Sequence, residues 1–159
     1  MQQFVNTTDH EHSRELLATP AALADWFAGE SLEVGPVGPA ALRRAHAVRG
    51  ALHELIVTGT AGDVLEVTAD RAKLTVDLET GNLRSRAPGL DGALGTLLAA
   101  VYDSVRDGSW ERLKACRNCG WAFWDESRNR SAAWCSMQLC GNRLKVRRHR
   151  AKVTPRSSR

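Results

Sequence analysis

Four cysteines in the C-terminal third of the chain have the spacing of a metal site. Cys116 and Cys119 are separated by two residues, and Cys135 and Cys140 follow after a gap of fifteen residues. Zinc prefers four soft or borderline ligands in a tetrahedron, and thiolates satisfy this preference at about 2.3 Å. The spacing therefore predicts one structural zinc ion held by four thiolates, with no position left for water or substrate.

Two other interpretations of these cysteines compete with zinc. A redox dithiol at Cys116 and Cys119 would need a βαβ context and would leave the second pair unexplained. A disulfide framework would need an oxidising compartment. The N-terminus lacks the charged and apolar regions of a signal peptide, and the sequence has no run of about 18 apolar residues. We therefore expect a cytoplasmic protein that does not span a membrane, in which zinc is favoured over disulfides.

The part of the chain that carries the cysteines is strongly basic. Residues 111–159 contain 13 Lys and Arg against 3 Asp and Glu, whereas residues 1–110 contain 9 against 15. A basic module on a mildly acidic body indicates a polyanionic partner, most often nucleic acid. Six of the cations crowd one predicted helix: Arg143, Lys145, Arg147, Arg148, Arg150 and Lys152.

The number of cations on this helix favours phosphate contacts over a purely structural role. At about 100° per residue, Arg143, Arg147 and Arg150 form one stripe and the other three form a second. Cations near a helix C-terminus interact favourably with the helix dipole, but this interaction explains only two or three of the six cations. Counterion release rewards each neutralised phosphate. We expect double-stranded DNA as the partner, with an acidic protein or RNA as the alternative.

The loop between the two cysteine pairs contains Arg128, Asn129 and Arg130. These side chains could reach phosphates or base edges, since Arg pairs with guanine and Asn with adenine. A structural role is equally compatible with the sequence, in which Asn129 holds a turn and Arg128 pairs with Asp125. We include all three as candidate nucleic-acid contacts.

Aromatic residues are dense around the cysteines: Trp121, Phe123, Trp124 and Trp134. They could stack on nucleic-acid bases. A small module, however, buries little apolar surface of its own. We therefore expect these rings to cover the zinc site and to dock it on the preceding domain.

No set of catalytic residues can be assembled from the sequence, so we expect a protein that is not an enzyme. It has no Ser-His-Asp order, Gly-rich phosphate loop or paired-carboxylate signature. His46 and His53 lie seven residues apart on one predicted helix and share a face, but no nucleophile accompanies them. A deep pocket lined by these histidines or by residues 4–7 would instead favour ligand sensing or catalysis.

The secondary structure expected around the cysteines is that of a treble-clef-like zinc finger. The Cys116–Cys119 turn leads into residues 121–124, whose composition is typical of a strand, so we expect a β-hairpin. Ser136 is placed to cap a helix that continues through Val146 to Lys152. Cys140 lies about one turn into this helix, so that its first turn supplies the last ligands.

The residues before the finger predict an α+β domain that is mostly helical. Thr19 and Pro20 open a short helix that ends at Gly29. A long helix begins at Pro39 and is closed by Gly59, and an apolar helix covers Leu90 to Val105.

A small antiparallel sheet completes the predicted N-terminal domain. Alternating, β-branched runs predict strands at 64–67, at 73–78 and at 83–86. The expected organisation is an α+β domain over residues 1–110, a zinc finger with a basic helix over 111–153, and a disordered tail over 154–159.

The finger residues also resemble those of a known family. The tetrapeptide Cys140-Gly141-Asn142-Arg143 and the runs Ser127-Arg128-Asn129 and Trp134-Cys135-Ser136-Met137 resemble the CGNR zinc finger, which is named for that tetrapeptide. The strip Phe4–Thr7, the pair Leu23-x2-Trp26 and the segment Val48–Leu52 resemble the companion ABATE domain. This resemblance implies a bacterial, stress-related transcription regulator whose finger binds DNA.

The sequence thus predicts a zinc-containing, DNA-binding transcription regulator whose C-terminal basic helix contacts phosphates. The first domain would act as a sensor or would form a homodimer. The alternative is an interaction module for protein or RNA, in which zinc serves as a staple and the N-terminal domain senses a ligand.

Overall fold

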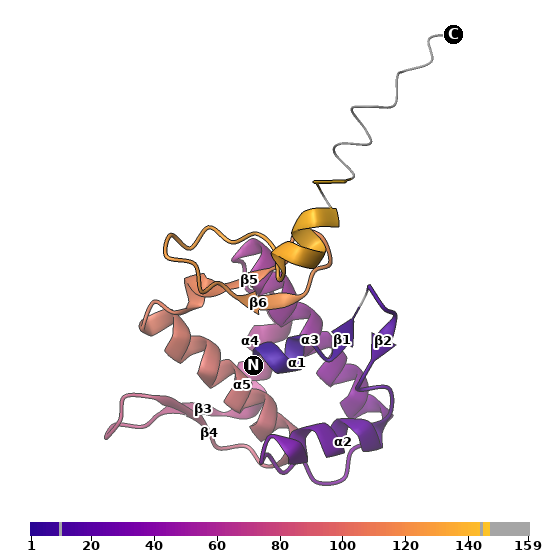
Figure 1. The fold of residues 1–159 in the computed structure, drawn as a ribbon. Coiled ribbons are helices and arrows are strands. Elements are labelled where there is room, and N and C mark those ends of the chain that lie inside the picture. Colours follow the sequence, from indigo (N-terminus) through magenta and orange to yellow (C-terminus); the bar gives the residue numbers. More distant parts are fainter. Residues whose placement is uncertain (10, 144, 147–159) are drawn as a thin grey trace.

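Helices form the body of the protein in the computed structural model, which describes residues 1–9, 11–143 and 145–146 (Figure 1). The short helix α1 (Gln2–Val5) is followed by α2 (Pro20–Gly29), α3 (Pro39–Thr58), α4 (Asp63–Ala72) and α5 (Gly89–Arg106). Within these described residues, none of the helices combines the length and the apolar character that crossing a bilayer requires.

The ends of α2 and α3 confirm the predicted helix boundaries. The Thr19 side chain accepts a hydrogen bond from the backbone N–H of Ala22 at 3.1 Å, and Pro20 occupies the first turn of α2. Helix α3 ends at Gly59, which has a φ of +75° and closes the helix in the left-handed conformation. Helix α5 matches the predicted apolar helix to within one residue at each end.

The predicted strand at 64–67 is wrong, because these residues belong to α4. The buried positions of this helix are Leu65, Thr68 and Ala72, which recur at three- and four-residue spacing on one face. Val64 and Val67 are exposed. The alternation that suggested a strand covers only four residues, too few to distinguish a period of two from one of 3.6.

Each described sheet is an antiparallel hairpin of two strands. β1 (Thr8–Asp9) pairs with β2 (Arg14–Glu15). β3 (Leu74–Val76) pairs with β4 (Leu83–Ser85), and these two strands lie within the strands predicted at 73–78 and 83–86. β5 (Leu113–Ala115) pairs with β6 (Ala122–Trp124), with Lys114 opposite Phe123. The α+β class with small antiparallel sheets is confirmed.

The main core lies between α1, α2, α3 and α5. Phe4, Phe27, Leu52 and Leu94 are fully buried in it, and Phe4 contacts the rings of Trp26 and Phe27 with centroid distances of 5.3 and 5.7 Å. These contacts bring the N-terminal strip into the centre of the molecule, as the position of α1 in Figure 1 shows.

The hairpin of β5 and β6 packs on this core. A single turn of 3-10 helix, η1 (Trp110–Arg112), connects α5 to β5 near the expected boundary at residue 110. Leu113 and Ala122 are buried in the same cluster as the helices. The cysteine module therefore continues directly from the helical body, at the end of the molecule shown uppermost in Figure 1.

Candidate metal centre

The first two cysteines lie on the turn of the β5–β6 hairpin. The backbone N–H of Cys116 donates to the Trp121 carbonyl at 2.9 Å, and that of Gly120 donates to the Cys116 carbonyl at 2.9 Å. Gly120 has a φ of +76°, which a side chain would disfavour. This tight turn brings the sulfurs of Cys116 and Cys119 into one cluster.

The second pair frames the start of a helix. The Ser136 side chain accepts a hydrogen bond from the backbone N–H of Leu139 at 3.3 Å, which confirms Ser136 as the N-cap. The first turn, η2 (Met137–Gly141), is a wide π-type turn in which Gly141 N donates to the Ser136 carbonyl at 3.0 Å. Cys140 lies inside this turn, so its sulfur faces that of Cys135.

The four sulfurs have the separations of a tetrahedral zinc site. The Sγ of Cys119 lies 3.7 Å from those of Cys135 and Cys140, which are 3.6 Å from each other. All four Sγ atoms lie within 4.8 Å of one another. A tetrahedron with Zn–S bonds of about 2.3 Å has edges of about 3.8 Å, so these residues fit one zinc ion closely.

The protonation of the thiols also favours a cation at this position. Burial raises the pKa of the Cys116 thiol. The backbone N–H groups of Cys135, Asn118 and Cys119 donate to its sulfur and outweigh this effect, so the pKa is lowered to about 6. Burial and contacts with neighbouring sulfurs raise the pKa of Cys119 to about 11 and also raise that of Cys135. A second thiolate beside the first is unfavourable without a counter-charge, and a divalent cation supplies that charge.

Aromatic and amide groups surround the sulfurs. Phe123 is buried against Cys116 and Cys140, and Trp121 and Trp134 pack on the same cluster. The Asn118 side chain donates to the Cys140 sulfur at 3.6 Å. These three rings cover the metal position as predicted, whereas Trp124 is 42% exposed on the outer side of β6.

This arrangement defines a structural zinc centre. All four cysteines are free of disulfides, and their thiolates fill a tetrahedral shell. When bound, zinc would link the hairpin turn to the first turn of the C-terminal helix. The finger has a small core of its own, so this link carries much of its folding energy.

A buried carboxylate organises the loop between the two cysteine pairs. Asp125 is fully buried and accepts hydrogen bonds from Lys114 Nζ at 2.6 Å, from the backbone N–H of Ser127 at 2.9 Å and from that of Ala132 at 3.0 Å. The contact with Lys114 and those with Ser127 hold the pKa of Asp125 well below its usual range. The predicted alternative pairing of Arg128 with Asp125 is wrong, because Lys114 occupies that place.

Asp125 is not among the functional residues that the sequence predicts. A local signal was present, since an Asp two residues before a Ser is typical of a turn in which the carboxylate accepts from the backbone. The second partner could not be found in this way. Lys114 meets Asp125 only because of the register of β5 and β6.

The candidate nucleic-acid residues divide into three groups in the structure. Arg128, Asn129 and Lys145 are exposed. Arg130, which has a φ of +50°, and Arg143 are also exposed, and they form ion pairs with Glu111 and Glu11 respectively. The remaining candidates and the predicted tail lie outside the described residues: Arg147, Arg148, Arg150, Lys152 and residues 154–159.

Side chains of the N-terminal domain form hydrogen bonds with the backbone of the β5–β6 hairpin. The Asn6 amide both accepts from Ala122 N at 2.9 Å and donates to Ala122 O at 2.8 Å, so it pairs with β6 as a neighbouring strand would. Gln2 Nε2 donates to the same carbonyl at 3.0 Å. His53 Nε2 donates to Gly120 O at 2.7 Å. The helical body therefore contacts both the hairpin strand and the metal-binding turn.

These features define a two-part protein in which a helical α+β domain carries a C-terminal treble-clef-like zinc finger with four cysteine ligands. Comparison with protein families gives the same division. Residues 1–108 match the ABATE family, described as "putative stress-induced transcription regulator", and residues 112–153 match the CGNR zinc finger. The chain belongs to the ABATE family and carries a CGNR zinc finger. No curated protein matches it.

Proposed function

We propose that this protein is a transcription regulator that binds duplex DNA through the basic residues that follow Cys140, while its N-terminal domain senses a signal. The observation that carries this proposal is the concentration of 13 Lys and Arg against 3 Asp and Glu in residues 111–159. A module of about 50 residues with such an excess is a strong attractor for a polyanion. The description of the ABATE family supports the same function.

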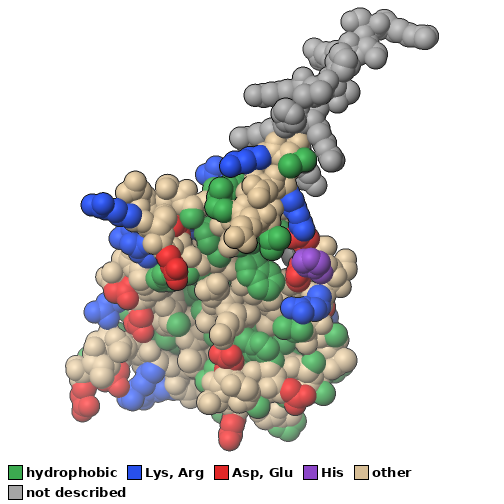
Figure 2. All heavy atoms as spheres, in the orientation of Figure 1, with side chains coloured by type: hydrophobic (Ala, Val, Ile, Leu, Met, Phe, Trp, Pro, Cys, Tyr) green, Lys and Arg blue, Asp and Glu red, His purple; other side chains and the backbone are tan. Residues whose placement is uncertain are grey.

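The described part of the finger exposes more cations than acids, and of its acids Glu111 pairs with Arg130 while Glu126 is exposed. Arg117, Arg128 and Lys145 are exposed and form no ion pair among the described residues. Asp125 is buried and already paired with Lys114. Figure 2 shows Lys and Arg side chains around the finger end of this face, above a body that carries most of the acidic side chains. The positive electrostatic potential at this end of the molecule therefore favours the binding of phosphates.

The zinc centre contributes by fixing the start of the helix that carries Arg143 and Lys145. Cys140 anchors η2, and the helix continues at Asn142–Arg143 and Lys145–Val146. A metal-anchored helix start loses little conformational entropy when it binds, which favours affinity. Trp121, Phe123 and Trp134 cover the metal, which leaves Trp124 as the exposed ring of this group for base stacking, so phosphate contacts would supply most of the affinity.

A salt-dependent binding titration tests this proposal. Zinc-loaded protein is titrated into fluorescein-labelled random duplex DNA at several salt concentrations, and binding is followed by fluorescence anisotropy. Replacing Lys145, Arg148 and Lys152 by Ala should weaken binding about uniformly across sequences. It should also flatten the plot of log K against log salt by up to about three units, about 0.9 for each lost phosphate contact.

The matched control removes the same charge from the N-terminal domain. Arg14, Arg43 and Arg86 are exposed and form no ion pair among the described residues. Their triple Ala variant should bind DNA with the slope of the parent. If the Lys145 variant and the corresponding triple Ala variant of Arg143, Arg147 and Arg150 both bind as the parent does at low salt, the basic helix is not the contact, and an interaction module for an acidic protein or RNA becomes the better account.

A further inference from the structure

The helix that begins after Ser136 is attached to the rest of the finger by one side only. Its described residues are 137–143 and 145–146, and of these Cys140, a zinc ligand, and Gly141 are buried. Every other described residue of this helix is exposed. Most of its described surface therefore faces outward, unlike that of α3, which buries residues at three- and four-residue spacing.

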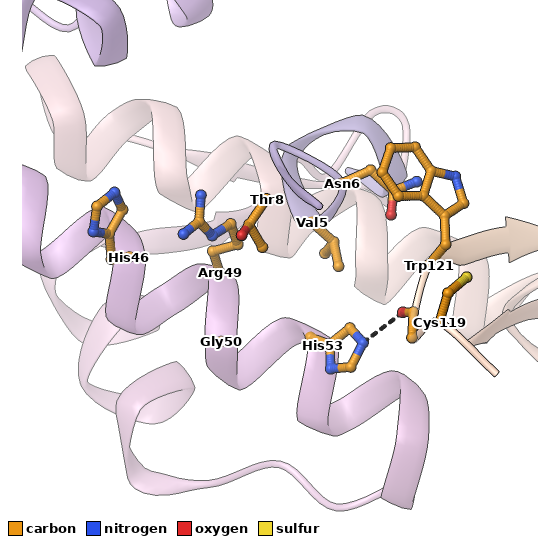
Figure 3. A pocket seen from close by; sticks show the side chains of 10 residues that line it. Val5, Asn6, Thr8, His46, Arg49, Gly50, His53, Cys119 and Trp121 are labelled. Atoms are coloured by element: carbon orange, nitrogen blue, oxygen red, sulfur yellow. Dashed lines mark hydrogen bonds between the residues drawn. The ribbon is translucent and has the colours of Figure 1, made fainter. Parts of the chain in front are cut away.

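The helical body holds the finger mainly at the hairpin. The Asn6 amide pairs with the backbone of β6, and His53 Nε2 donates to Gly120 O at 2.7 Å (Figure 3). The helix after Ser136 meets the N-terminal domain at the ion pair of Arg143 with Glu11. It lies at the end of the molecule opposite to α2, uppermost in Figure 1. A partner can therefore reach the outer face of this helix without displacing the body.

Two amide side chains lie on the outer face. Gln138 and Asn142 come two residues before and two residues after Cys140, so at about 100° per residue both lie roughly opposite to the metal side of the helix. They are four residues apart and are therefore neighbours on one face. Both are exposed, and neither side chain has a hydrogen-bond partner among the described residues. Their donors and acceptors are thus available to a partner.

Large apolar side chains flank the two amides. Met137 is 56% exposed, Leu139 is 60% exposed and Val146 is 48% exposed. Single exposed apolar residues are common, but three on a helix this short form a continuous feature of the surface, and such surfaces mark binding sites. The partner must therefore offer apolar groups as well as donors and acceptors.

The charge around this face favours a polyanion. Residues 137–152 contain six Lys and Arg and no Asp or Glu. Arg143 is paired with Glu11, whereas Lys145 is exposed and forms no ion pair among the described residues. Lys145 follows Asn142 by three residues and extends the same face. An acidic protein would also satisfy this charge, but uncharged amides add little to its attraction, whereas they match the edges of bases.

We propose that Gln138 and Asn142 recognise adenine in the major groove of duplex DNA, and that Met137 and Leu139 contact the methyl group of thymine. The major groove of DNA admits an α-helix. In this groove an amide forms a bidentate pair with N6 and N7 of adenine, and the thymine of the same base pair presents its methyl group. Duplex RNA is disfavoured because its major groove is too deep and narrow for side chains. This assignment rests on the proposed function and adds the bases that the helix recognises.

Selection from a random duplex DNA library tests the assignment with zinc-loaded, full-length protein. Bound duplexes are sequenced, and fluorescence anisotropy gives the Kd for the enriched site and for random duplex DNA. The parent should enrich sites with A·T pairs at two positions, one for each amide. Gln138→Ala and Asn142→Ala should each relax the preference at one position and weaken binding to the enriched site by about 5- to 150-fold, the range for one bidentate contact.

The same variants should leave non-specific binding nearly unchanged. Neither amide neutralises a phosphate, so the Kd for random duplex DNA should change by less than about twofold. Both residues are exposed, and Asn142 has a φ of −68° and a ψ of −39°, so alanine fits the helix at these positions. The matched control, Gln3→Ala with Asn82→Ala, removes one Gln and one Asn from exposed positions of the N-terminal domain. It should keep the enriched site and the Kd of the parent.

A base analogue distinguishes the major groove from the minor groove. Inosine lacks the N2 amino group of guanine, so its pair with cytosine presents the minor-groove edge of an A·T pair and the major-groove edge of a G·C pair. Replacing the A·T pairs of the enriched site by inosine–cytosine pairs should therefore weaken binding as much as replacing them by G·C pairs.

The outcomes for the assignment and for the proposed function are distinguishable. The assignment is overturned if no A·T positions are enriched, if the Ala variants bind the enriched site like the parent, or if inosine–cytosine pairs are bound like A·T pairs. In each of these cases, salt-dependent binding of random duplex DNA would leave the proposed function standing. A protein that binds no duplex DNA at low salt, or that binds only RNA or an acidic protein, overturns the proposed function together with the assignment.

Discussion

Three of the zinc ligands, Cys116, Cys119 and Cys140, are positioned by backbone that is hydrogen-bonded nearby. The turn at Gly120 sets Cys119, and the capped turn after Ser136 sets Cys140. Backbone N–H groups also donate to the Cys116 sulfur. Such groups stabilise thiolates and orient them, which strengthens the hold on the metal. The finger should therefore bind zinc through all four thiolates.

Replacing Cys119 and Cys140 together by Ser should abolish zinc binding. Zinc loading of the parent should be about one ion per chain by elemental analysis, and native mass spectrometry should show the loss in the double variant. Ala132→Ser and Ala133→Ser in the same module add hydroxyls without removing a ligand, so this control should retain the metal. Zinc retained at full stoichiometry in the Cys variant would rule out this ligand set.

The ligands could be predicted at the scale of the residue because they are local pairs. Two or four residues separate the members of each pair, and the chemistry of zinc selects cysteine at such spacings. The partners of Lys114 and Arg143 could not be predicted. Lys114 finds Asp125 through strand register, and Arg143 finds Glu11 across the fold, so neither pair leaves a pattern in the sequence.

At the scale of the element, the sequence predicts long helices correctly, whereas a short helix could be mistaken for a strand. Helix α3 shows its apolar face over 20 residues and ends at Gly59, whereas α4 has only 10 residues and was mistaken in part for a strand. The role of each helical glycine was also hidden. Gly50 and Gly95 both lie inside helices, yet their surroundings differ completely.

Replacing each of these two glycines by alanine should change the free energy of unfolding in opposite directions. A Cβ at Gly95 would lie 2.5 Å from the Ala72 Cβ and 2.8 Å from the Ser85 Cβ, so α5 must move away from α4 and β4. Gly95→Ala should destabilise the protein by about 1–3 kcal/mol. Gly50→Ala meets open space and should stabilise it by about 0.4–1 kcal/mol, because the unfolded chain loses freedom.

Thermal unfolding of the zinc-loaded proteins measures both effects. For a chain of this size, 1 kcal/mol corresponds to about 2–4 °C in Tm. The two variants serve as controls for each other, since they make the same substitution in the same kind of element. A rise in Tm for Gly95→Ala would mean that α4 and α5 are not packed as closely as described.

At the scale of the whole molecule, the finger is tied to the helical body by contacts on both sides of the metal-binding turn. Asn6 pairs with the Ala122 backbone, and His53 holds Gly120. Beyond the zinc, Glu11 on the turn between β1 and β2 forms an ion pair with Arg143. Glu11 and a DNA phosphate would therefore compete for the same guanidinium group.

If the protein binds DNA as proposed, Glu11→Gln should tighten binding. The exposed pair with Arg143 is worth about 0.2–1 kcal/mol, so its removal should raise the affinity by up to about fivefold. It should also steepen the salt dependence by up to about 0.9, the value of one additional phosphate contact. Anisotropy titrations of random duplex DNA, performed at several salt concentrations, measure both quantities.

Two comparisons separate competition for Arg143 from the loss of one negative charge. Glu126→Gln removes an exposed carboxylate that forms no ion pair among the described residues, so it reports the effect of charge alone. In an Arg143→Ala background, Glu11→Gln should change the affinity no more than Glu126→Gln does, because the competing partner is gone. Equal effects of the two Gln variants in the parent would show that Glu11 does not compete with DNA.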